Sequence, residues 1–248
     1  MTDPEIETFP SPDALAAAVA GRLVVRLAAI QAAGRTPSIA LTGGTVAVKI
    51  HQAVVTATEG HEDVDWGNVD IWWGDERYLP EEDPERNAGQ AWDAMLSHLD
   101  VSPGRVHEMP ASDGPHDSVQ EAAEAYGETL RSRGGEGFDV VMLGLGPDGH
   151  VASLFPGSAQ LDVRDAVAVA VTDSPKPPPE RVSLTFGALN RTAEVWFVVT
   201  GTGKAGAVAQ ALATGDDAAD VHDLPAVGVH GRDATVWFLD EEAASKLG

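Results

Sequence analysis

The sequence predicts an α/β fold with a mostly parallel central sheet. Short apolar segments alternate along the chain with segments of helical character, which is the pattern of strand–helix units. Four apolar segments end in turns rich in glycine or charge, and in open parallel sheets ligands bind beyond the carboxyl ends of the strands. The 248 residues contain no internal repeat and no linker long enough to separate domains, so one domain over residues 1–248 is expected.

The first half of the chain supplies two predicted strands. SIALTGGT (38–45) is a short apolar run that ends in a glycine turn, and NVDIWWGDERYLP (68–80) is a second run that ends in charge. An acidic loop follows the second strand. Amphipathic spacing or helix-favouring composition predicts the helices of this half: 14–30, 47–55, 87–99 and 118–133.

The second half supplies four further predicted strands and one helix. The strands are FDVVMLGLG (138–146), DAVAVAVT (165–172), EVWFVVTG (194–201) and ATVWFLD (234–240). A helix over 203–213 follows the third of these strands directly. SPKPPPERV is predicted to be a stiff loop. After FDVVMLGLG, Pro156 restricts the next helical segment to about two turns, since proline is disfavoured inside a helix.

Composition excludes several classes of partner. The 39 acidic and 16 basic residues give a formal net charge of -23, which repels nucleic acid and anionic membranes. The chain has no cysteine, which excludes disulfides and thiol chemistry and fits a cytoplasmic location. Arg22 and Arg26 interrupt the first apolar stretch too soon for a membrane span or a signal peptide. We therefore expect a cytoplasmic protein with neither a nucleic-acid nor a membrane partner.

Two of the strand-end turns indicate an anionic ligand. LTGGT offers backbone N–H groups beside Thr42 and Thr45 at the start of a helix, which suits a phosphate but also fits a plain strand–helix turn. Lys204 opens a helix, where a cation is unfavourable unless it serves another purpose. Arg77 ends a strand beside Asp75 and Glu76, so a simple ion pair is the alternative there. In a chain with only four lysines, cations at two strand ends favour a phosphorylated ligand.

The turn LGLGPDGH carries the most specific chemistry. Gly144, Gly146 and Gly149 match the G-x-G-x-x-G pattern of dinucleotide sites, but no long helix follows, and the acidic residue at the right separation lies at the wrong end of a strand (Asp165). His150 follows a buried strand at the expected site edge, where a neutral imidazole can act as a general base. Because no H-x-H or H-x-x-x-H spacing accompanies His150, a metal site is not favoured.

Taken together, five segments resemble the 6-phosphogluconolactonase family over nearly the whole chain, from about Phe9 to the last strand. They are LTGGT, WWGDERYLPEEDPERNAGQAW, LGLGPDGHVASLFPGS, PPPERVSLT and VVTGTGKA. The resemblance implies a Rossmann-like three-layer α/β sandwich, related to the glucosamine-6-phosphate deaminase and ribose-5-phosphate isomerase folds. It also implies hydrolysis of 6-phospho-D-glucono-1,5-lactone in the oxidative pentose phosphate pathway, without metal or cofactor, by a monomer or small homo-oligomer.

The resemblance also implies roles for individual residues. His150 is similar to the base that activates a water for attack on the lactone carbonyl, with Asp148 shaping its turn. Arg77 and Asp75 complete the catalytic set that the resemblance implies. The substrate and phosphate contacts that it implies are Gly43, Gly44, Thr45, Arg77, Arg181 and Lys204. The first turn reads TGGTVA, without the serine and proline common in the family, which affects the details of this turn.

Two alternative functions share parts of this pattern. A glucosamine-6-phosphate deaminase or isomerase would share the fold and the D-G-H triplet, but there the following segment typically supplies a glutamate. Here that segment is HVASLFP, with Ser153 and Leu154 and no carboxylate. A non-catalytic sugar-phosphate-binding protein would keep the phosphate contacts and lose the base, whereas this chain retains His150.

Overall fold

The computed structural model describes residues 3–59, 63–133, 137–215 and 218–247. Its strands are β1 (Glu5–Phe9), β2 (Ser38–Leu41), β3 (Asp70–Trp73), β4 (Asp75–Arg77), β5 (Val140–Leu143), β6 (Ala168–Val171), β7 (Arg181–Leu184), β8 (Glu194–Val199) and β9 (Ala234–Asp240). Its α-helices are α1 (Pro12–Ala32), α2 (Thr45–Thr58), α3 (Asn87–Ala94), α4 (Val119–Arg133), α5 (Phe186–Leu189), α6 (Ala205–Ala211) and α7 (Glu241–Ala244).

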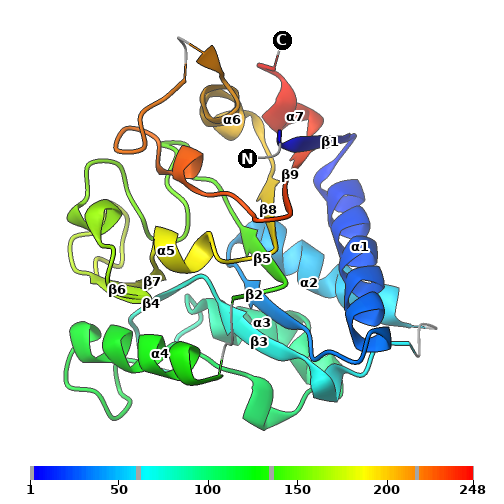
Figure 1. Cartoon of the computed structure of the whole chain (residues 1–248), viewed down its shortest axis with the longest axis vertical. Helices are drawn as coiled ribbons and strands as arrows, with labels where there is room; N and C mark the ends of the chain where they lie inside the picture. Colours follow the sequence, from blue (N-terminus) through cyan, green and yellow to red (C-terminus); the bar gives the residue numbers. More distant parts are fainter. Residues whose placement is uncertain (1–2, 60–62, 134–136, 216–217, 248) are drawn as a thin grey trace.

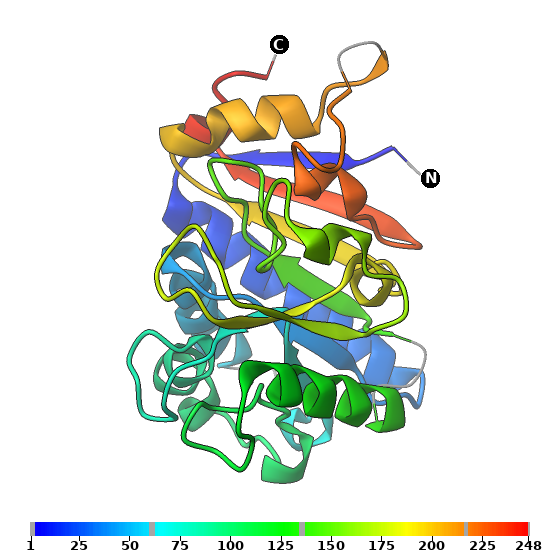
Figure 2. The same cartoon turned by 90° about the vertical axis from the view of Figure 1, so that its left-hand side faces the viewer.

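Six strands form the central sheet in the order β1-β9-β8-β5-β2-β3, and every neighbouring pair in it is parallel. The helices α1 and α2 cover one face of this sheet (Figure 1). The other face is covered by α4, α5 and a second, smaller sheet, which stand in front of the central sheet in Figure 2. The predicted α/β fold with a mostly parallel central sheet is therefore confirmed.

The smaller sheet corrects the strand predicted over 68–80 and contains the strand predicted over 165–172. Its order is β4-β7-β6, with antiparallel pairing throughout. The segment 68–80 is not one strand, because Gly74 carries the chain from one sheet to the other. The Gly74 N–H donates to the Leu41 carbonyl of β2, and the Gly74 carbonyl accepts from the Leu184 N–H of β7. DAVAVAVT forms β6 of this small sheet, and so lies outside the parallel sheet.

The segment after β5 is not helical, contrary to expectation. Residues 147–154 form consecutive turns, closed by hydrogen bonds from the Gly146 N–H to the His150 carbonyl (2.9 Å) and from the Gly149 N–H to the Gly146 carbonyl (3.0 Å). Gly149 has a φ of 80°, a left-handed backbone conformation that glycine adopts more easily than residues with a side chain. The five longer helices expected from the sequence are confirmed as α1, α2, α3, α4 and α6, although α3 ends at Ala94 and a separate 3₁₀ turn follows over Leu96–His98.

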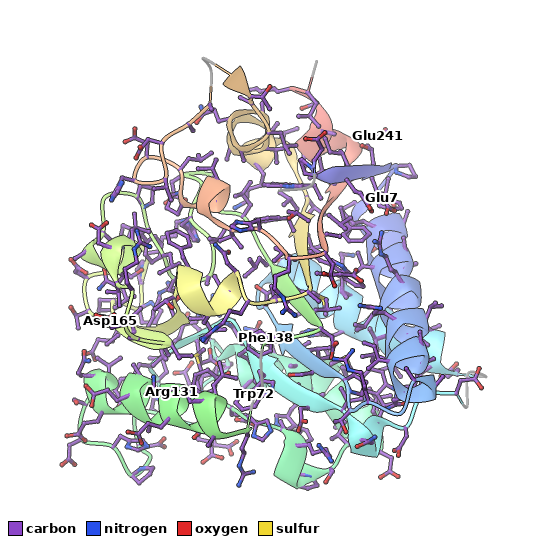
Figure 3. All side chains as sticks on the ribbon, in the orientation of Figure 1. Glu7, Trp72, Arg131, Phe138, Asp165 and Glu241 are labelled. Atoms are coloured by element: carbon purple, nitrogen blue, oxygen red, sulfur yellow. The ribbon has the colours of Figure 1, made fainter. Side chains whose placement is uncertain are left out.

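Aromatic side chains pack β3, an edge strand of the central sheet, against α4. Trp72 of β3 is completely buried, and its ring meets the rings of Tyr126 and Phe138 at 6.0 and 6.4 Å. The neighbouring positions of Trp72 and Phe138 can be followed in Figure 3. The Tyr126 hydroxyl accepts from the Trp73 N–H and donates to the Trp73 carbonyl, each at 3.0 Å. These contacts hold β3 in place just before the chain turns toward the smaller sheet. In the described ranges, every helix is too short or too polar to cross a membrane.

Candidate active site

A cavity of about 250 Å³ lies at the carboxyl ends of β2, β3 and β5, with the loop before β7 and the turn after β8 at its rim. Seven predicted site residues line it: Gly43, Gly44, Asp75, Arg77, His150, Arg181 and Lys204. Thr42 of the LTGGT turn lines it too, as do residues that were not expected at the site, among them Asn87, Ala152 and Lys176. The predicted residues Thr45 and Asp148 are outside this lining, and Thr45 is exposed to solvent.

The first turn presents a helix start to the cavity. Gly44 has a φ of 95° and precedes α2, whose first turn has no side-chain cap. Its backbone N–H groups are therefore available to an anion. Gly43 leaves the space that Asn87 occupies, since a Cβ at Gly43 would lie 1.8 Å from the Asn87 Oδ1 atom. The Thr42 hydroxyl accepts from the Gly144 N–H at 3.4 Å and so joins this turn to the end of β5.

Arg77 is oriented by neutral oxygens. Its Nη1 donates to the Glu85 carbonyl (2.6 Å) and to the Asn87 Oδ1 atom (2.7 Å), and the Asn87 amide donates in turn to the Asp75 carbonyl (2.9 Å). Neither acceptor of Arg77 is a carboxylate, so these bonds fix the guanidinium without neutralising its charge.

Arg77 and Arg181 lie opposite each other on neighbouring strands of the small sheet. They are register partners in β4 and β7, and both line the cavity. Like charges directly opposite each other are destabilising. Burial lowers the pKa of Arg181, and the Arg77 charge acts in the same direction. This pair of cations is consistent with an anionic ligand.

The buried carboxylate of Glu76 holds the backbone of Arg77 and Asn87. The Glu76 side chain accepts the backbone N–H groups of Arg77, Asn87 and Ala88 at 2.7–2.8 Å. Arg86, equally buried, lies 4.0 Å from Glu76. Burial raises the pKa of Glu76, although Arg86 and the three N–H donors oppose that shift. Glu76 thus joins the end of β4 to the start of α3.

His150 and Asp148 form a hydrogen-bonded pair. The His150 Nδ1 atom lies 2.5 Å from the Asp148 Oδ1 atom. Because a carboxylate oxygen only accepts, the proton belongs on Nδ1, which leaves Nε2 free to accept another proton. Gly146 makes room for this arrangement, since a Cβ there would lie 1.9 Å from the His150 Nδ1 atom.

The surroundings of the pair keep the imidazole neutral and the carboxylate ionised. Burial lowers the pKa of His150, and the Lys176 charge acts in the same direction, while Asp148 and Asp75 oppose both. For Asp148, burial alone would raise the pKa, but the hydrogen bond with His150 and the nearby Lys176 charge act against burial, and the pKa is lowered. At neutral pH, His150 can therefore accept a proton.

Asp75 is held by a serine from the turn after His150. The Ser153 hydroxyl donates to the Asp75 Oδ2 atom at 2.6 Å, and both side chains are buried. The Ser153 N–H donates to the Ser183 hydroxyl of β7 at 3.1 Å. Ala152, just before Ser153, adopts a φ of 48°, which is unusual for a residue with a side chain. The carboxylate expected from the sequence in the catalytic set is thus held by the turn after His150, which is itself bonded to β7 of the small sheet.

Two lysines bring positive charge to the cavity. Lys204 ends the 3₁₀ turn Thr202–Lys204 and stands at the start of α6, as the sequence predicted. Burial lowers its pKa, and the Lys176 charge adds to this effect. Lys176 was not expected at the site, although its position five residues before Arg181 in the proline-rich segment was the available signal. Across the described residues, no three His, Asp or Glu side chains gather as metal ligands, and metal independence stays a prediction.

Comparisons with known proteins agree with this geometry. The family model described as glucosamine-6-phosphate isomerases/6-phosphogluconolactonase matches residues 10–237. The chain is 44% identical to the 6-phosphogluconolactonase of Mycobacterium tuberculosis over 98% of each chain. It is 41% identical to the 6-phosphogluconolactonase of Streptomyces coelicolor, with 100% of this chain and 96% of the relative covered.

Solved structures show the same fold. The 6-phosphogluconolactonase of Trypanosoma brucei superposes with a TM-score of 0.83 at 26% identity and covers 100% of both chains. A monomeric glucosamine-6-phosphate deaminase superposes with a TM-score of 0.81 at 20% identity, covering 98% of this chain and 99% of its own, which shows the fold alone. The sheet, the helices around it and the matched sequence agree: the chain belongs to the glucosamine-6-phosphate isomerase/6-phosphogluconolactonase family.

Proposed function

We propose that the protein hydrolyses 6-phospho-D-glucono-1,5-lactone to 6-phospho-D-gluconate in the oxidative pentose phosphate pathway, with His150 as the general base. The observation that carries the proposal is the hydrogen bond between His150 Nδ1 and Asp148, with His150 lining a cavity that cations also line. The curated relatives that match nearly the whole chain carry the name of this lactonase, which supports the same reaction here.

The reaction follows from the position of the free imidazole nitrogen. His150 Nε2 takes a proton from water as the water oxygen bonds to the lactone carbonyl carbon, which gives a tetrahedral oxyanion. The bond between that carbon and the ring oxygen then breaks, and the ring oxygen takes the proton from His150. One water is consumed, the imidazole returns to its neutral state, and the carboxylic acid that forms releases its remaining proton to solvent to give the carboxylate of the product. A general base of this kind contributes a factor of roughly 10²–10⁴.

The cations and the first turn bind the anionic parts of the substrate. The phosphate is assigned to the start of α2 at Gly43 and Gly44 together with Lys204, since a helix start and a lysine both favour a dianion. Arg77 lines the cavity and is held by Asn87, so its fixed guanidinium can stabilise charge on the substrate. Binding the remote phosphate orients the lactone ring over His150.

The site favours lactone hydrolysis over the isomerase reaction of the same family. The segment after His150 carries Ser153, whose hydroxyl is bound to Asp75, and so supplies no carboxylate for ring opening. Glucosamine 6-phosphate is therefore the appropriate competing substrate in any assay.

The decisive experiment measures hydrolysis of freshly generated 6-phosphogluconolactone, corrected for spontaneous opening, with and without a chelator. Wild-type protein is compared with His150→Ala and with His98→Ala, the same change at an exposed histidine outside the cavity lining. We expect chelator-resistant turnover by the wild type and by His98→Ala. We expect a loss of roughly 10²-fold or more in kcat for His150→Ala, with its circular dichroism unchanged.

Two results would contradict the proposal in different ways. A folded wild type that does not accelerate lactone opening, but converts glucosamine 6-phosphate, would move the protein to the isomerase branch of the family. Full turnover by His150→Ala would keep the lactonase reaction and remove His150 as the base.

The cellular setting remains part of the proposal. A cytoplasmic location is supported by the absence of cysteine, and independence from nucleic acid by the net charge of -23. We further propose one domain over residues 1–248 acting as a monomer or small homo-oligomer.

A further inference from the structure

We propose that Lys176 is a positioning residue that sets the protonation state of the His150–Asp148 pair. In this role its ammonium keeps the imidazole neutral between turnovers. The inference deepens the proposed function, because it concerns the residue to which that function assigns the base.

The geometry places Lys176 against both members of the pair. The Lys176 Nζ atom lies 3.3 Å from the His150 Nδ1 atom and 3.5 Å from the Asp148 Oδ1 atom. The Asp148 Oδ1 atom also accepts the proton of Nδ1 at 2.5 Å. Two donors therefore converge on one carboxylate oxygen. Lys176 thereby neutralises part of the charge that would otherwise stabilise an imidazolium.

The charges around His150 show why a cation is needed there. Asp148 on the same turn and Asp75 on β4 both favour the protonated imidazole. Lys176 opposes them from the loop before β7, and Arg77, Arg181 and Lys204 line the same cavity. Of these four cations, Lys176 is the one whose charged group lies within 3.5 Å of the pair. Without it, two carboxylates would act on a half-enclosed imidazole and bring it closer to the charged state, which cannot accept a proton.

Hydrogen bonds from Ser174 and Arg181 hold the backbone around Lys176 in place. The Ser174 hydroxyl accepts from the Lys176 N–H at 3.2 Å and donates to the Lys176 carbonyl at 2.8 Å. The buried guanidinium of Arg181 donates to the carbonyls of Lys176, Pro177 and Pro178 at 3.0–3.2 Å. Arg181 was expected from the sequence to contact the substrate, but its Nε and Nη2 atoms donate to the loop. The segment 174–181 holds one lysine over the catalytic pair.

The test uses three variants. Lys176→Met removes the charge and keeps the length, and Lys176→Arg keeps the charge. Lys49→Met makes the same charge change at a lysine outside the cavity lining, where Lys49 pairs with Asp13. The pKa of His150 is measured in the free protein by following the imidazole NMR signals with pH, and His150→Gln identifies the signal among the eight histidines. The pH profile of kcat/KM is measured in parallel.

For Lys176→Met we expect the pKa of His150 to rise. We also expect the acid limb of kcat/KM to move to higher pH by the same amount. Near pH 5.5, kcat/KM should fall by roughly 3- to 10-fold relative to wild type, and near pH 8 the two should agree within about twofold. Lys176→Arg should restore most of the wild-type profile, and Lys49→Met should match wild type.

Either of two results would overturn the proposal. An unchanged pKa of His150 in Lys176→Met would show that the lysine does not control the pair. A raised KM with an unshifted pH profile would make Lys176 a substrate contact instead. The NMR titration needs no substrate, so it stays decisive even if the protein proves to catalyse a different reaction.

Discussion

Gly146 leaves the space in which the His150 imidazole meets Asp148. A Cβ at this position would lie within 2.3 Å of the Nδ1 and Cε1 atoms of His150 and of the Asp148 Oδ1 atom. The glycine is therefore required by the catalytic pair itself. Gly149 meets a different constraint, because its φ is positive and a Cβ there would lie 2.1 Å from the Leu224 Cδ1 atom.

Gly146→Ala should displace the imidazole and lower kcat by roughly 10-fold or more, since a misplacement of about 1 Å can cost 10²-fold. Gly89→Ala is the matched control, because a Cβ on that glycine of α3 meets nothing within 4 Å. Steady-state kinetics on both variants, with thermal unfolding as a check on folding, decide the matter. Equal kcat values in the two variants would show that the imidazole accommodates the methyl group.

Single residues of the site were predictable where a local pattern carries the chemistry. The D-G-H triplet and the cations at strand ends are local features, and they were enough to indicate His150, Asp148, Arg77 and Lys204. Asn87 and Lys176 could not be given their roles in this way, because each acts through a contact that only the tertiary fold creates. Asn87 reaches the Gly43 turn from α3, and Lys176 reaches Asp148 from a loop that Arg181 holds.

At the level of elements, Gly74 separates β3 from β4, two strands that the sequence predicts to be one. Its two backbone groups bond to different sheets, so Asp75 and Arg77 leave the central sheet and join β7. Apolar periodicity cannot distinguish a chain that passes from one sheet to another from a continuous strand. β1 and β7 were not expected either, since β1 is an edge strand with mostly exposed residues and β7 directly follows three prolines and a glutamate. The central strands were predictable because they are continuous apolar runs.

Glu76 is the element-level support of the site, and Glu76→Gln should cost about 3–5 kcal/mol of unfolding free energy. The change leaves the buried Arg86 without its charge partner and weakens the bonds from the α3 N–H groups. Urea unfolding at neutral pH measures the effect. The surface variant Glu128→Gln on α4 makes the same charge change and should stay within about 0.5 kcal/mol of wild type. A loss below about 1 kcal/mol in Glu76→Gln would show that Arg86 and the helix start are stabilised by other contacts.

The whole molecule combines a strongly negative surface with a cavity that gathers cations. The formal net charge is -23, while Arg77, Lys176, Arg181 and Lys204 line one cavity. Four of the 16 basic residues therefore surround the site, where an anionic substrate needs them. The rest of the chain carries an excess of carboxylates that repel one another in the folded state.

Screening this repulsion should stabilise the protein. Between about 20 mM and about 500 mM sodium chloride near neutral pH, we expect the melting temperature to rise by several degrees, since 1 kcal/mol moves it by roughly 2–4 °C in a chain of this size. Differential scanning calorimetry checks the shift. Near the isoelectric point of about 4.4, the salt effect should vanish. A melting temperature that falls with salt near neutral pH would show that local ion pairs dominate instead.

The pairing of β1 with β9 has a consequence for biosynthesis. In Figure 1 the first strand lies at the edge of the sheet beside the last one, and all five of its residues are in register with β9. A ribosome releases β1 long before β9 exists, so the strand waits without a partner while the rest of the sheet is made. Its charged residues Glu5 and Glu7, which pair with Arg22 of α1, suit that wait, because they discourage association with other nascent chains until β9 arrives.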